Sequence, residues 1–409
     1  MALIVQKYGG TSVGSIELIH KVAARVARVR ERGDRVVVAV SAMGDATDRL
    51  VDLARSLCPA PDPRELDALL ATGEQVSIAL LAMALTARGV PARSFTGAQV
   101  RIRTTSAHGR ARIEAVETAM LTAALDAGIV PVVAGFQGVD AEGAITTIGR
   151  GGSDTTAVAL AVALRADECQ ILTDVDGVYT TDPRMVRGAR RLERLSFEEM
   201  LELAGQGSRV LHLRAVEFAA KYGLALRVLA SHGDGPGTLI DREDPTVEAP
   251  VVSGIAFNRD EAQIVISGVP NAPDTAHRLL WPVSDAGIEI DMIVLAPNED
   301  GTADFAFTVH RGDYVQALEL ARRGAAYCPA ARVDGTDRVA KMSIVGVGMR
   351  SHAGVAARLF ATLASAGITV RLVSTSEIRI SVLLAEAELE RAVHETHDAF
   401  SLSGQSGFI

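Results

Sequence analysis

Residues 2–12, Ala-Leu-Ile-Val-Gln-Lys-Tyr-Gly-Gly-Thr-Ser, begin the stretch that decides the fold. A short apolar run leads into two adjacent glycines, and residues 16–32 then follow a helical pattern. The apolar residues of that pattern recur at the helical period, so they are expected on one buried face: Ile19, Val22, Ala23, Val26 and Val29. The sequence therefore predicts a strand, a glycine turn and an amphipathic helix.

The same alternation continues over roughly the first 240 residues. Continuous apolar runs at 36–40 and 129–134 are typical of strands covered on both faces. The remaining expected elements are helices at 65–88 and 155–164 and strands at 171–173 and 225–229. Strands that alternate with helices predict an α/β fold with a mainly parallel sheet, whose ligands bind beyond the carboxyl ends of the strands.

Composition excludes several classes of protein. With 48% hydrophobic and 22% charged residues, the 409-residue chain is expected to fold, as two or three domains. Its net charge of −9 argues against nucleic acid as a partner. Apolar runs such as 157–164 are shorter than the ~20 residues of a membrane span, so no membrane partner is expected. Three scattered cysteines, without metal-ligand spacing, favour a cytoplasmic location and no protein-held metal.

An internal repeat occupies the last third of the chain, after turn-rich segments at 232–237 and 241–250. Ala286-Gly-Ile288 and Ala366-Gly-Ile368 share a register, at an offset of 80 residues. Each copy reads as most of a βαββαβ unit, and such a long period indicates a duplicated domain. The expected domains are 1–245, 251–335 and 336–409.

Lys7, Gly9 and Gly10 form the first candidate site. Adjacent glycines let backbone N–H groups approach an anion, and the lysine supplies a positive charge for phosphoryl oxygens. The order of residues matches neither a P-loop nor a dinucleotide fingerprint. The alternative is an ordinary glycine turn with a solvated lysine.

Arg150 lies in a second glycine-rich segment, 146–156, which runs into an apolar helix. An arginine in a glycine loop can hold a carboxylate through two hydrogen bonds. Ser153 and Asp154 fall at the expected start of the helix, where the alternative role is helix capping. Capping does not explain the glycines beside the arginine, so a binding role is favoured.

Glu74 and the loop 173–184 complete the candidates. A carboxylate on a mostly apolar helix either faces solvent or meets a cationic ligand group, and alone the solvent interpretation is favoured. The loop 173–184 directly follows a strand and contains Asp176-Gly177, so it is either a simple hairpin or a nucleotide-side loop.

Taken together and in this order, these segments resemble the aspartate kinases of the amino-acid kinase superfamily, over residues 2–384. The stretches that carry the resemblance are Val5-Gln-Lys-Tyr-Gly-Gly10, Val40-Ser-Ala-Met-Gly44, Phe95-Thr-Gly97, Ala134-Gly-Phe-Gln-Gly138, Gly149–Thr156 and Thr173–Arg184. The resemblance implies an αβα sandwich with a mainly parallel sheet, followed by two ferredoxin-like βαββαβ ACT domains. It also implies a homodimer or higher homo-oligomer.

The implied reaction transfers the γ-phosphate of ATP, with Mg²⁺, to the side-chain carboxylate of L-aspartate. The product, 4-phospho-L-aspartate, would begin the biosynthesis of lysine, threonine and methionine. The implied catalytic residues are Lys7 and Asp154. The implied substrate-binding residues are Ser41, Thr47, Glu74, Arg150 and Ser153. The implied ATP-binding residues are Lys7, Gly9, Gly10, Thr173, Asp174, Tyr179, Asp182 and Arg184.

The regulatory half departs from the family pattern. Many feedback-regulated relatives carry a Gln-Asn pair where this chain has Leu295-Ala296, and residues 271–274 differ from the usual Asp-Lys-Pro-Gly. The implied effector residues are Asp274, Asp291, Met292, Leu295, Ser374, Thr375 and Glu377. We hypothesise weakened inhibition by lysine and threonine, because lost amide groups weaken a pocket for a zwitterion. The alternative is that backbone contacts compensate.

Two other functions compete with this interpretation. The chain could be a kinase for another amino-acid carboxylate, such as glutamate, although such relatives generally lack tandem ACT domains. It could also be a non-catalytic amino-acid sensor, which the complete set of charged site residues disfavours.

Overall fold

The computed structural model describes residues 1–208, 210–243, 250–328 and 330–403, which form two compact units. The first unit comprises residues 1–178, 191–204 and 210–243. The second comprises residues 179–190, 205–208 and the described residues from 250 onward. Part of the turn-rich segment 241–250, and the expected domain ends at 245 and 409, lie outside the described residues.

An eight-stranded sheet forms the centre of the first unit, in the order β10-β12-β11-β9-β1-β2-β6-β3. Every neighbouring pair is parallel except β11 and β12. The strands are β1 (Leu3–Tyr8), β2 (Arg35–Val40), β3 (Ala92–Phe95), β6 (Val130–Ala134), β9 (Glu168–Thr173), β10 (Arg194–Ser196), β11 (Leu226–Ala230) and β12 (Thr238–Asp241). The predicted mainly parallel sheet is confirmed, and β9 begins three residues before the predicted start.

The helices of this unit cover both faces of the sheet. On one face, α1 and α4 share a core with strand residues such as Tyr8, Val38 and Val132. On the other face, α6 contacts β1, β2 and β9. The helices are η1 (Gly10–Val13), α1 (Ile16–Glu31), α2 (Ala46–Leu57), α3 (Pro63–Leu70), α4 (Thr72–Ala87), α5 (Ala119–Asp126), α6 (Gly152–Leu164), α7 (Phe197–Gly205) and α8 (Leu213–Tyr222). All five apolar residues predicted on the buried face of α1 are buried.

The predicted single helix at 65–88 is two helices, because the chain breaks between α3 and α4 at Ala71. By length and composition alone, residues 63–87 could cross a membrane, which the sequence analysis did not anticipate. Half of that apolar window is buried inside the unit, where Leu81 and Leu85 of α4 pack in the core. Such a segment is weak evidence for a membrane span, and here it is a core element.

The first unit also contains a smaller four-stranded sheet, in the order β5-β4-β7-β8. Its strands are β4 (Ile102–Thr104), β5 (Ile113–Val116), β7 (Gln137–Val139) and β8 (Ile145–Thr147). The glycine segment 149–152 follows β8 and leads directly into α6. This small sheet therefore sets the starting point of the arginine-bearing loop.

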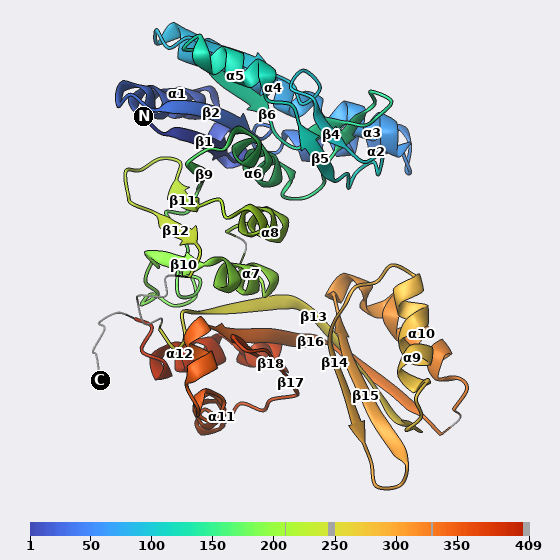
Figure 1. Ribbon diagram of the computed structural model, residues 1–409. Helices are drawn as coiled ribbons and strands as arrows, with labels where there is room; N and C mark the ends of the chain where they lie inside the picture. The colour runs from blue at the N-terminus through green and yellow to red at the C-terminus, as the bar shows by residue number, and fades with distance from the viewer. Residues whose placement is uncertain (209, 244–249, 329, 404–409) are drawn as a thin grey trace. The chain divides into compact units, whose positions relative to one another are not determined.

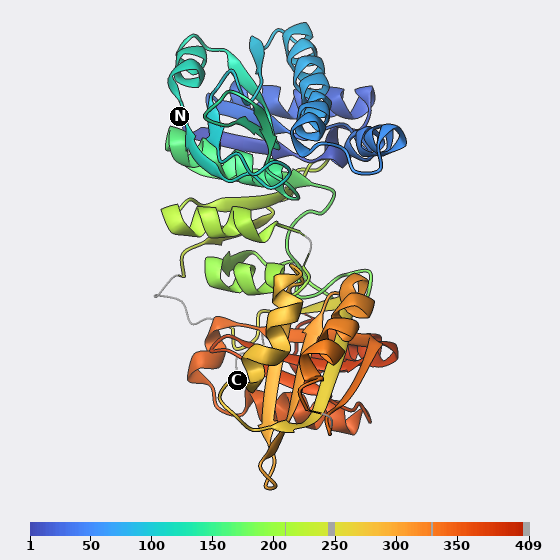
Figure 2. The same ribbon diagram turned by 90° about the vertical axis from the view of Figure 1, so that its right-hand side faces the viewer.

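The second unit contains a six-stranded antiparallel sheet, in the order β14-β15-β13-β16-β18-β17. Figure 1 shows α9 and α10 over one half of it and α11 and α12 over the other, and the turned view in Figure 2 shows the same helices against the strands. The strands are β13 (Gly254–Pro270), β14 (Ile290–Pro297), β15 (Thr302–Val309), β16 (Arg332–Val345), β17 (Leu372–Thr375) and β18 (Arg379–Ala385). The helices are α9 (Thr275–Asp285), η2 (Arg311–Asp313), α10 (Tyr314–Ala325), η3 (Val347–Ser351), α11 (Val355–Ser365), η4 (Glu386–Glu388) and α12 (Leu389–Ala399).

The repeat in the sequence is visible as repeated structure. Helices α9 and α11 begin 80 residues apart, at Thr275 and Val355, and each is followed by a strand pair and a second helix. The long strands β13 and β16 run through both halves, so that residues 254–258 of β13 pair with the second copy. Because β16 crosses the expected boundary at 335/336, the division into three domains stays a prediction.

Candidate active site

Lys7 lies near the carboxyl end of β1 and pairs with Asp154 in the first turn of α6, with 2.6 Å between Lys7 Nζ and Asp154 Oδ1. Both side chains are largely buried. The solvated lysine considered above is therefore not what the structure shows. A Cβ on Gly10 would lie 2.9 Å from the backbone oxygen of Ala42, so glycine allows the turns after β1 and β2 to approach closely.

Glu74 is buried in the first turn of α4, with 2% of its surface exposed. Its Oε1 accepts a hydrogen bond from the backbone N–H of Ala42 at 3.0 Å, whereas its buried Oε2 has no partner among the described residues. Burial raises the pKa of Glu74 to about 7, against the lowering effect of the Ala42 hydrogen bond. The favoured solvent-facing interpretation is wrong, and the free oxygen is poised for a cationic ligand group.

Arg150 is flanked by two glycines whose backbone conformation and surroundings exclude a larger residue. Gly149 and Gly151 have φ angles of +82° and +72°, and a Cβ on Gly151 would lie 2.1 Å from the His212 ring. Arg150 is exposed, and its side chain makes no hydrogen bond or ion pair within the described part of the chain. Its guanidinium is thus available to a ligand.

The start of α6 does not support the alternative role of Ser153 and Asp154 as helix caps. Its N-cap is Gly151, with no side-chain capping bond, so Ser153 and Asp154 lie inside the first turn. There they sit beside the free backbone N–H groups that attract anions. Neither residue acts as the cap, which leaves both available to the site.

One cavity of about 280 Å³ joins these segments. The predicted residues that line it are Lys7, Gly10, Ser41, Thr47, Glu74, Arg150, Ser153 and Asp154. They come from four separate stretches of the chain, at the carboxyl ends of β1 and β2 and the starts of α4 and α6. We call this cavity the catalytic cleft.

Thr173 is the last residue of β9 and Asp174 follows it, and the Thr173 hydroxyl donates to Asp174 Oδ1 at 3.0 Å. The hairpin alternative for this loop is wrong, because β9 pairs only with β1 and β11 within the described residues, both in parallel. Tyr179, Asp182 and Arg184 belong to the second unit. Burial acts to raise the pKa of Asp182, but its hydrogen bonds from Arg184 outweigh burial and lower that pKa. Their assignment to the nucleotide stays a prediction.

The predicted effector residues lie in the second unit at three kinds of position. Asp274 precedes α9 and pairs with Arg278. Asp291, Met292 and Leu295 lie on β14, one edge strand of the sheet, where Asp291 pairs with the buried Lys341. Ser374 and Thr375 lie on β17, the opposite edge, and Glu377 follows that strand and pairs with Arg350.

Sequence reasoning missed several residues that shape the cleft. Phe136 lines it in a left-handed conformation, with φ +67°, which a non-glycine residue adopts only when its surroundings hold it. Asp67 is buried and accepts hydrogen bonds from the backbone and hydroxyl of Thr147, at 2.9 and 2.5 Å, and from Gly109. It thereby fixes the end of β8 before the arginine loop. The quoted stretch 134–138 includes Phe136, whereas no local pattern marks Asp67.

Among the described residues, no group of three or more histidine, cysteine, aspartate or glutamate side chains could hold a metal ion. Glu74 and Asp154 are the carboxylates that line the cleft. This donor set suits a hard cation that arrives with phosphate oxygens and waters, rather than one caged by the protein.

Known proteins match the chain over its whole length. A model of the amino acid kinase family matches residues 2–230, and a model of the ACT domain matches residues 342–400. The aspartokinase of Pseudomonas aeruginosa is 59% identical over 404 residues, 98% of each chain. The aspartate kinase of Stutzerimonas stutzeri is 58% identical over 408 residues, 100% of this chain and 99% of that one.

A solved structure agrees with these relatives. The aspartokinase III of E. coli, in complex with aspartate and ADP, superposes with a TM-score of 0.81 at 25% identity, over 97% of this chain and 99% of that chain. The predictions of the family, the fold class and the kinase function are confirmed. The chain belongs to the aspartate kinase family and, like these relatives, is an ATP-dependent phosphotransferase.

Proposed function

We propose that the catalytic cleft recognises all three charged groups of L-aspartate and phosphorylates its side chain. Glu74 binds the ammonium group, Arg150 binds the α-carboxylate, and Ser41, Thr47 and Ser153 contribute polar contacts. The observation that carries this assignment is the buried, unpartnered Oε2 of Glu74 in a cleft that also contains Arg150 and the Lys7–Asp154 pair. A buried carboxylate oxygen without a partner is costly, and an ammonium group supplies the missing donor.

The reaction joins two anions, so charge neutralisation is its main requirement. Two unit charges ~4 Å apart repel by ~4 kcal/mol at an effective dielectric constant of 20. Lys7 neutralises the oxygens of the transferring group, and Asp154 orients Lys7 through their ion pair. An oxygen of the aspartate side chain forms a bond to the γ-phosphorus, and the bond from that phosphorus to the β,γ-bridging oxygen breaks. ADP leaves, and the product is 4-phospho-L-aspartate.

The aspartate side chain is already ionised at neutral pH, so the cleft needs no general base. Catalysis then depends on positioning and on preorganised positive charge. The backbone N–H groups at Gly10 and the start of α6 add to the charge of Lys7, whereas the N–H of Gly9 already donates to Leu172 O at 3.3 Å. Consistent with this chemistry, the residues that line the cleft in the described part of the chain include no histidine.

ATP is assigned to Thr173 and Asp174 at the carboxyl end of β9, and to Tyr179, Asp182 and Arg184 in the following loop. Mg²⁺ would be held by the phosphates and by Asp154, and it would supply further positive charge to the phosphoryl oxygens when bound. The charged and polar composition of this loop supports the assignment.

We further propose a role at the start of lysine, threonine and methionine biosynthesis, in the cytoplasm and as a homo-oligomer. The free cysteines Cys58, Cys169 and Cys328 support a reducing compartment. The paired ACT-like halves of the second unit support effector binding. Inhibition by lysine and threonine is proposed to be weak, because Leu295 and Ala296 lack the amides of regulated relatives.

A hydroxamate assay tests the substrate, because hydroxylamine traps acyl phosphates. Aspartate and glutamate are compared at equal concentration with saturating Mg-ATP, and Lys7→Ala serves as the control for contaminating kinases. We expect product with aspartate alone. Faster turnover of glutamate would instead identify another amino-acid kinase, and nucleotide binding without turnover would identify a sensor.

The same assay tests regulation, with millimolar lysine, threonine and both together. We expect little inhibition under any of the three conditions. Strong concerted inhibition would contradict the proposal that the effector pocket is weakened.

A further inference from the structure

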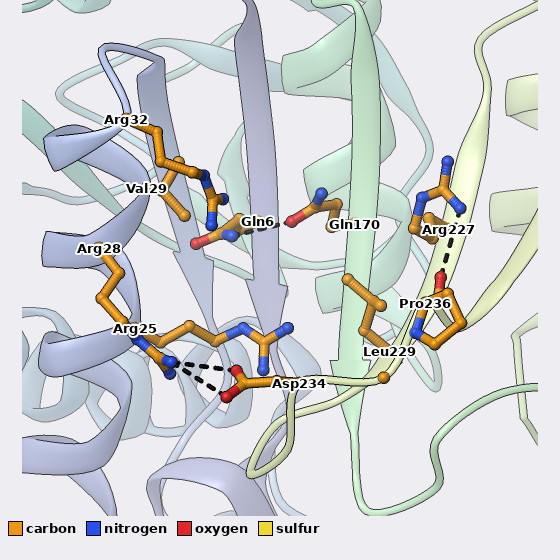
Figure 3. Close-up of a pocket in the computed structure, with 11 residues that line it drawn as sticks. Gln6, Arg25, Arg28, Val29, Arg32, Gln170, Arg227, Leu229, Asp234 and Pro236 are labelled. Atoms are coloured by element: carbon orange, nitrogen blue, oxygen red, sulfur yellow. Dashed lines mark hydrogen bonds and ion pairs between the residues drawn. The ribbon is translucent and has the colours of Figure 1, made fainter.

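A second cavity of the first unit, about 490 Å³ in volume, is lined by four arginines. Arg25 and Arg28 come from α1, Arg32 is the C-cap of that helix, and Arg227 comes from β11. The spacing of the first three places them on one side of the helix. Figure 3 shows their side chains around a floor formed by Gln6 and Gln170. Such a concentration of positive charge is unexpected in a chain with a net charge of −9. We call it the arginine cavity.

The floor of the arginine cavity is a chain of polar side chains on strands that would otherwise be apolar. Gln6 Nε2 donates to Gln170 Oε1 at 2.8 Å, and Gln170 Nε2 donates to Glu168 Oε1 at 2.7 Å. Arg227 Nε donates to Glu168 Oε2 at 3.0 Å. Gln6 is 1% exposed, so its amide is buried in the centre of the sheet. This network fixes the orientation of the groups beneath the arginines.

The negative charges at the cavity do not balance the positive ones. Asp234 pairs with Arg28, and Glu168 pairs with Arg227. Among the described residues, Arg25 donates only to the backbone oxygens of Ala230 and Gly233, at 3.0 and 2.5 Å. In the described part of the chain, the side chain of Arg32 makes no hydrogen bond or ion pair. Two guanidinium groups are therefore left without a counter-charge.

A purely structural role explains part of this arrangement. Arg25 and Arg28 hold the exposed loop 232–236 against α1, and Arg227 donates to Pro236 O at 3.3 Å. That role leaves Arg32 unused, and it leaves a cavity large enough for a small metabolite. The pKa of His232, on the same loop, is lowered mainly by burial and further by the positive charges of Lys21 and Arg25. The lowered pKa is consistent with a positive potential at the rim.

We propose that the arginine cavity binds a small phosphorylated metabolite. Its phosphate dianion lies between the guanidinium groups of Arg25 and Arg32, which match phosphate oxygens in charge and geometry. Val29 and Leu229, which also line the cavity, contact the carbon portion of the molecule. The volume lies within the range of ordinary ligand pockets, and it exceeds what a bare phosphate needs.

The arginine cavity is separate from the catalytic cleft. Gln6 and Lys7 are adjacent on β1, and successive side chains of a strand point to opposite faces of the sheet. Gln6 lines the arginine cavity, Lys7 lines the catalytic cleft, and no residue lines both. A ligand in the arginine cavity would thus contact the strand that carries the catalytic lysine, from its other face.

Isothermal titration calorimetry on the full chain, at constant ionic strength, tests the proposal with inorganic phosphate and ribose 5-phosphate as probes. The variants are Arg32→Ala, Lys7→Ala and the control Arg55→Ala, which removes an exposed arginine from α2. We expect Lys7→Ala and Arg55→Ala to retain a saturable site for ribose 5-phosphate. We expect Arg32→Ala to weaken it at least about tenfold, because a charge-assisted hydrogen-bond pair is lost.

Arg32 is exposed and has no side-chain partner among the residues that the structure describes, so its variant should fold and keep the aspartate kinase kcat, which the hydroxamate assay measures independently. Unchanged affinity in Arg32→Ala would overturn the proposal, as would the absence of saturable binding in the wild type. If Lys7→Ala alone lost binding, the phosphate would lie in the catalytic cleft, and this result would also overturn the proposal. Tighter binding of ribose 5-phosphate than of inorganic phosphate would support the contact with Val29 and Leu229, and equal affinity would contradict it.

Discussion

The Michaelis constant for aspartate should depend on the ionisation of Glu74. Burial raises the pKa of this carboxyl group to about 7, and its Oε2 has no partner in the described structure. An ammonium group binds the ionised carboxylate, so aspartate competes with a proton for Glu74. Below the pKa the carboxyl is neutral and aspartate binds weakly, and above it the site is fully available.

The size of the effect follows from one-proton linkage. With a pKa of about 7, the ionised fraction rises roughly tenfold between about pH 6 and about pH 8, so KM for aspartate should fall roughly tenfold over the same interval. In Glu74→Gln the amide oxygen can still accept from Ala42 N–H, but the charge is lost. We expect KM to rise by about 10- to 100-fold and to lose its pH dependence.

Initial rates at saturating Mg-ATP, measured with varied aspartate across this pH range, check the prediction. Glu65→Gln, which changes an exposed glutamate on the neighbouring α3, is the matched control and should follow the wild type. A KM for aspartate that does not change with pH in the wild type would refute the reasoning. The same slope in Glu74→Gln as in the wild type would show that another group titrates.

Four further substitutions test the cleft. Lys7→Ala should lower kcat by about 10²- to 10³-fold with an unchanged circular dichroism spectrum, because preorganised positive charge is lost; near-normal turnover would remove Lys7 from the mechanism. Arg150→Ala should raise KM for aspartate at least about tenfold and leave ATP binding intact, as measured by calorimetry; lost nucleotide binding would reassign this residue. Gly151→Ala should destabilise the folded protein by about 2 kcal/mol, because its φ is +72° and its Cβ would meet the His212 ring. Asp67→Asn should lower the free energy of unfolding, measured with denaturant, by about 3 kcal/mol, because an amide NH₂ would face hydrogen-bond donors. A change below ~0.5 kcal/mol would contradict the role of Asp67.

Local patterns were sufficient for several main elements of the fold, such as α1, β2 and β6, whereas shorter elements such as β3, β7 and α5 were not predicted. The apolar period of residues 16–32 corresponds to α1, and the 80-residue offset corresponds to the starts of α9 and α11. Both signals depend on residues near one another in the chain, where periodicity reflects burial directly. The break between α3 and α4 escaped prediction, although Thr72 and Gly73, which directly follow Ala71, are weak helix formers.

The residue types of the candidate site could be predicted from the sequence, but their burial and their hydrogen-bond partners could not. Glycines with positive φ angles beside Arg150 mark a loop that the sequence already indicated. The burial of Glu74 was misjudged from its place on a mostly apolar helix, because its hydrogen-bond partner is the backbone N–H of Ala42, in another part of the chain.

The sequence by itself determined the alternation of the main strands and helices of the first unit, the duplicated second unit and the chemical types of the site residues. Only the tertiary structure decided that Lys7, Glu74, Arg150 and Asp154 line one cavity, that a carboxyl group there titrates near neutrality, and that Asp67 supports the arginine loop. The physical reason is that hydrophobic periodicity is a local property of the chain. Desolvation and charge pairing instead depend on residues that lie far apart in sequence and meet only when the sheet has formed.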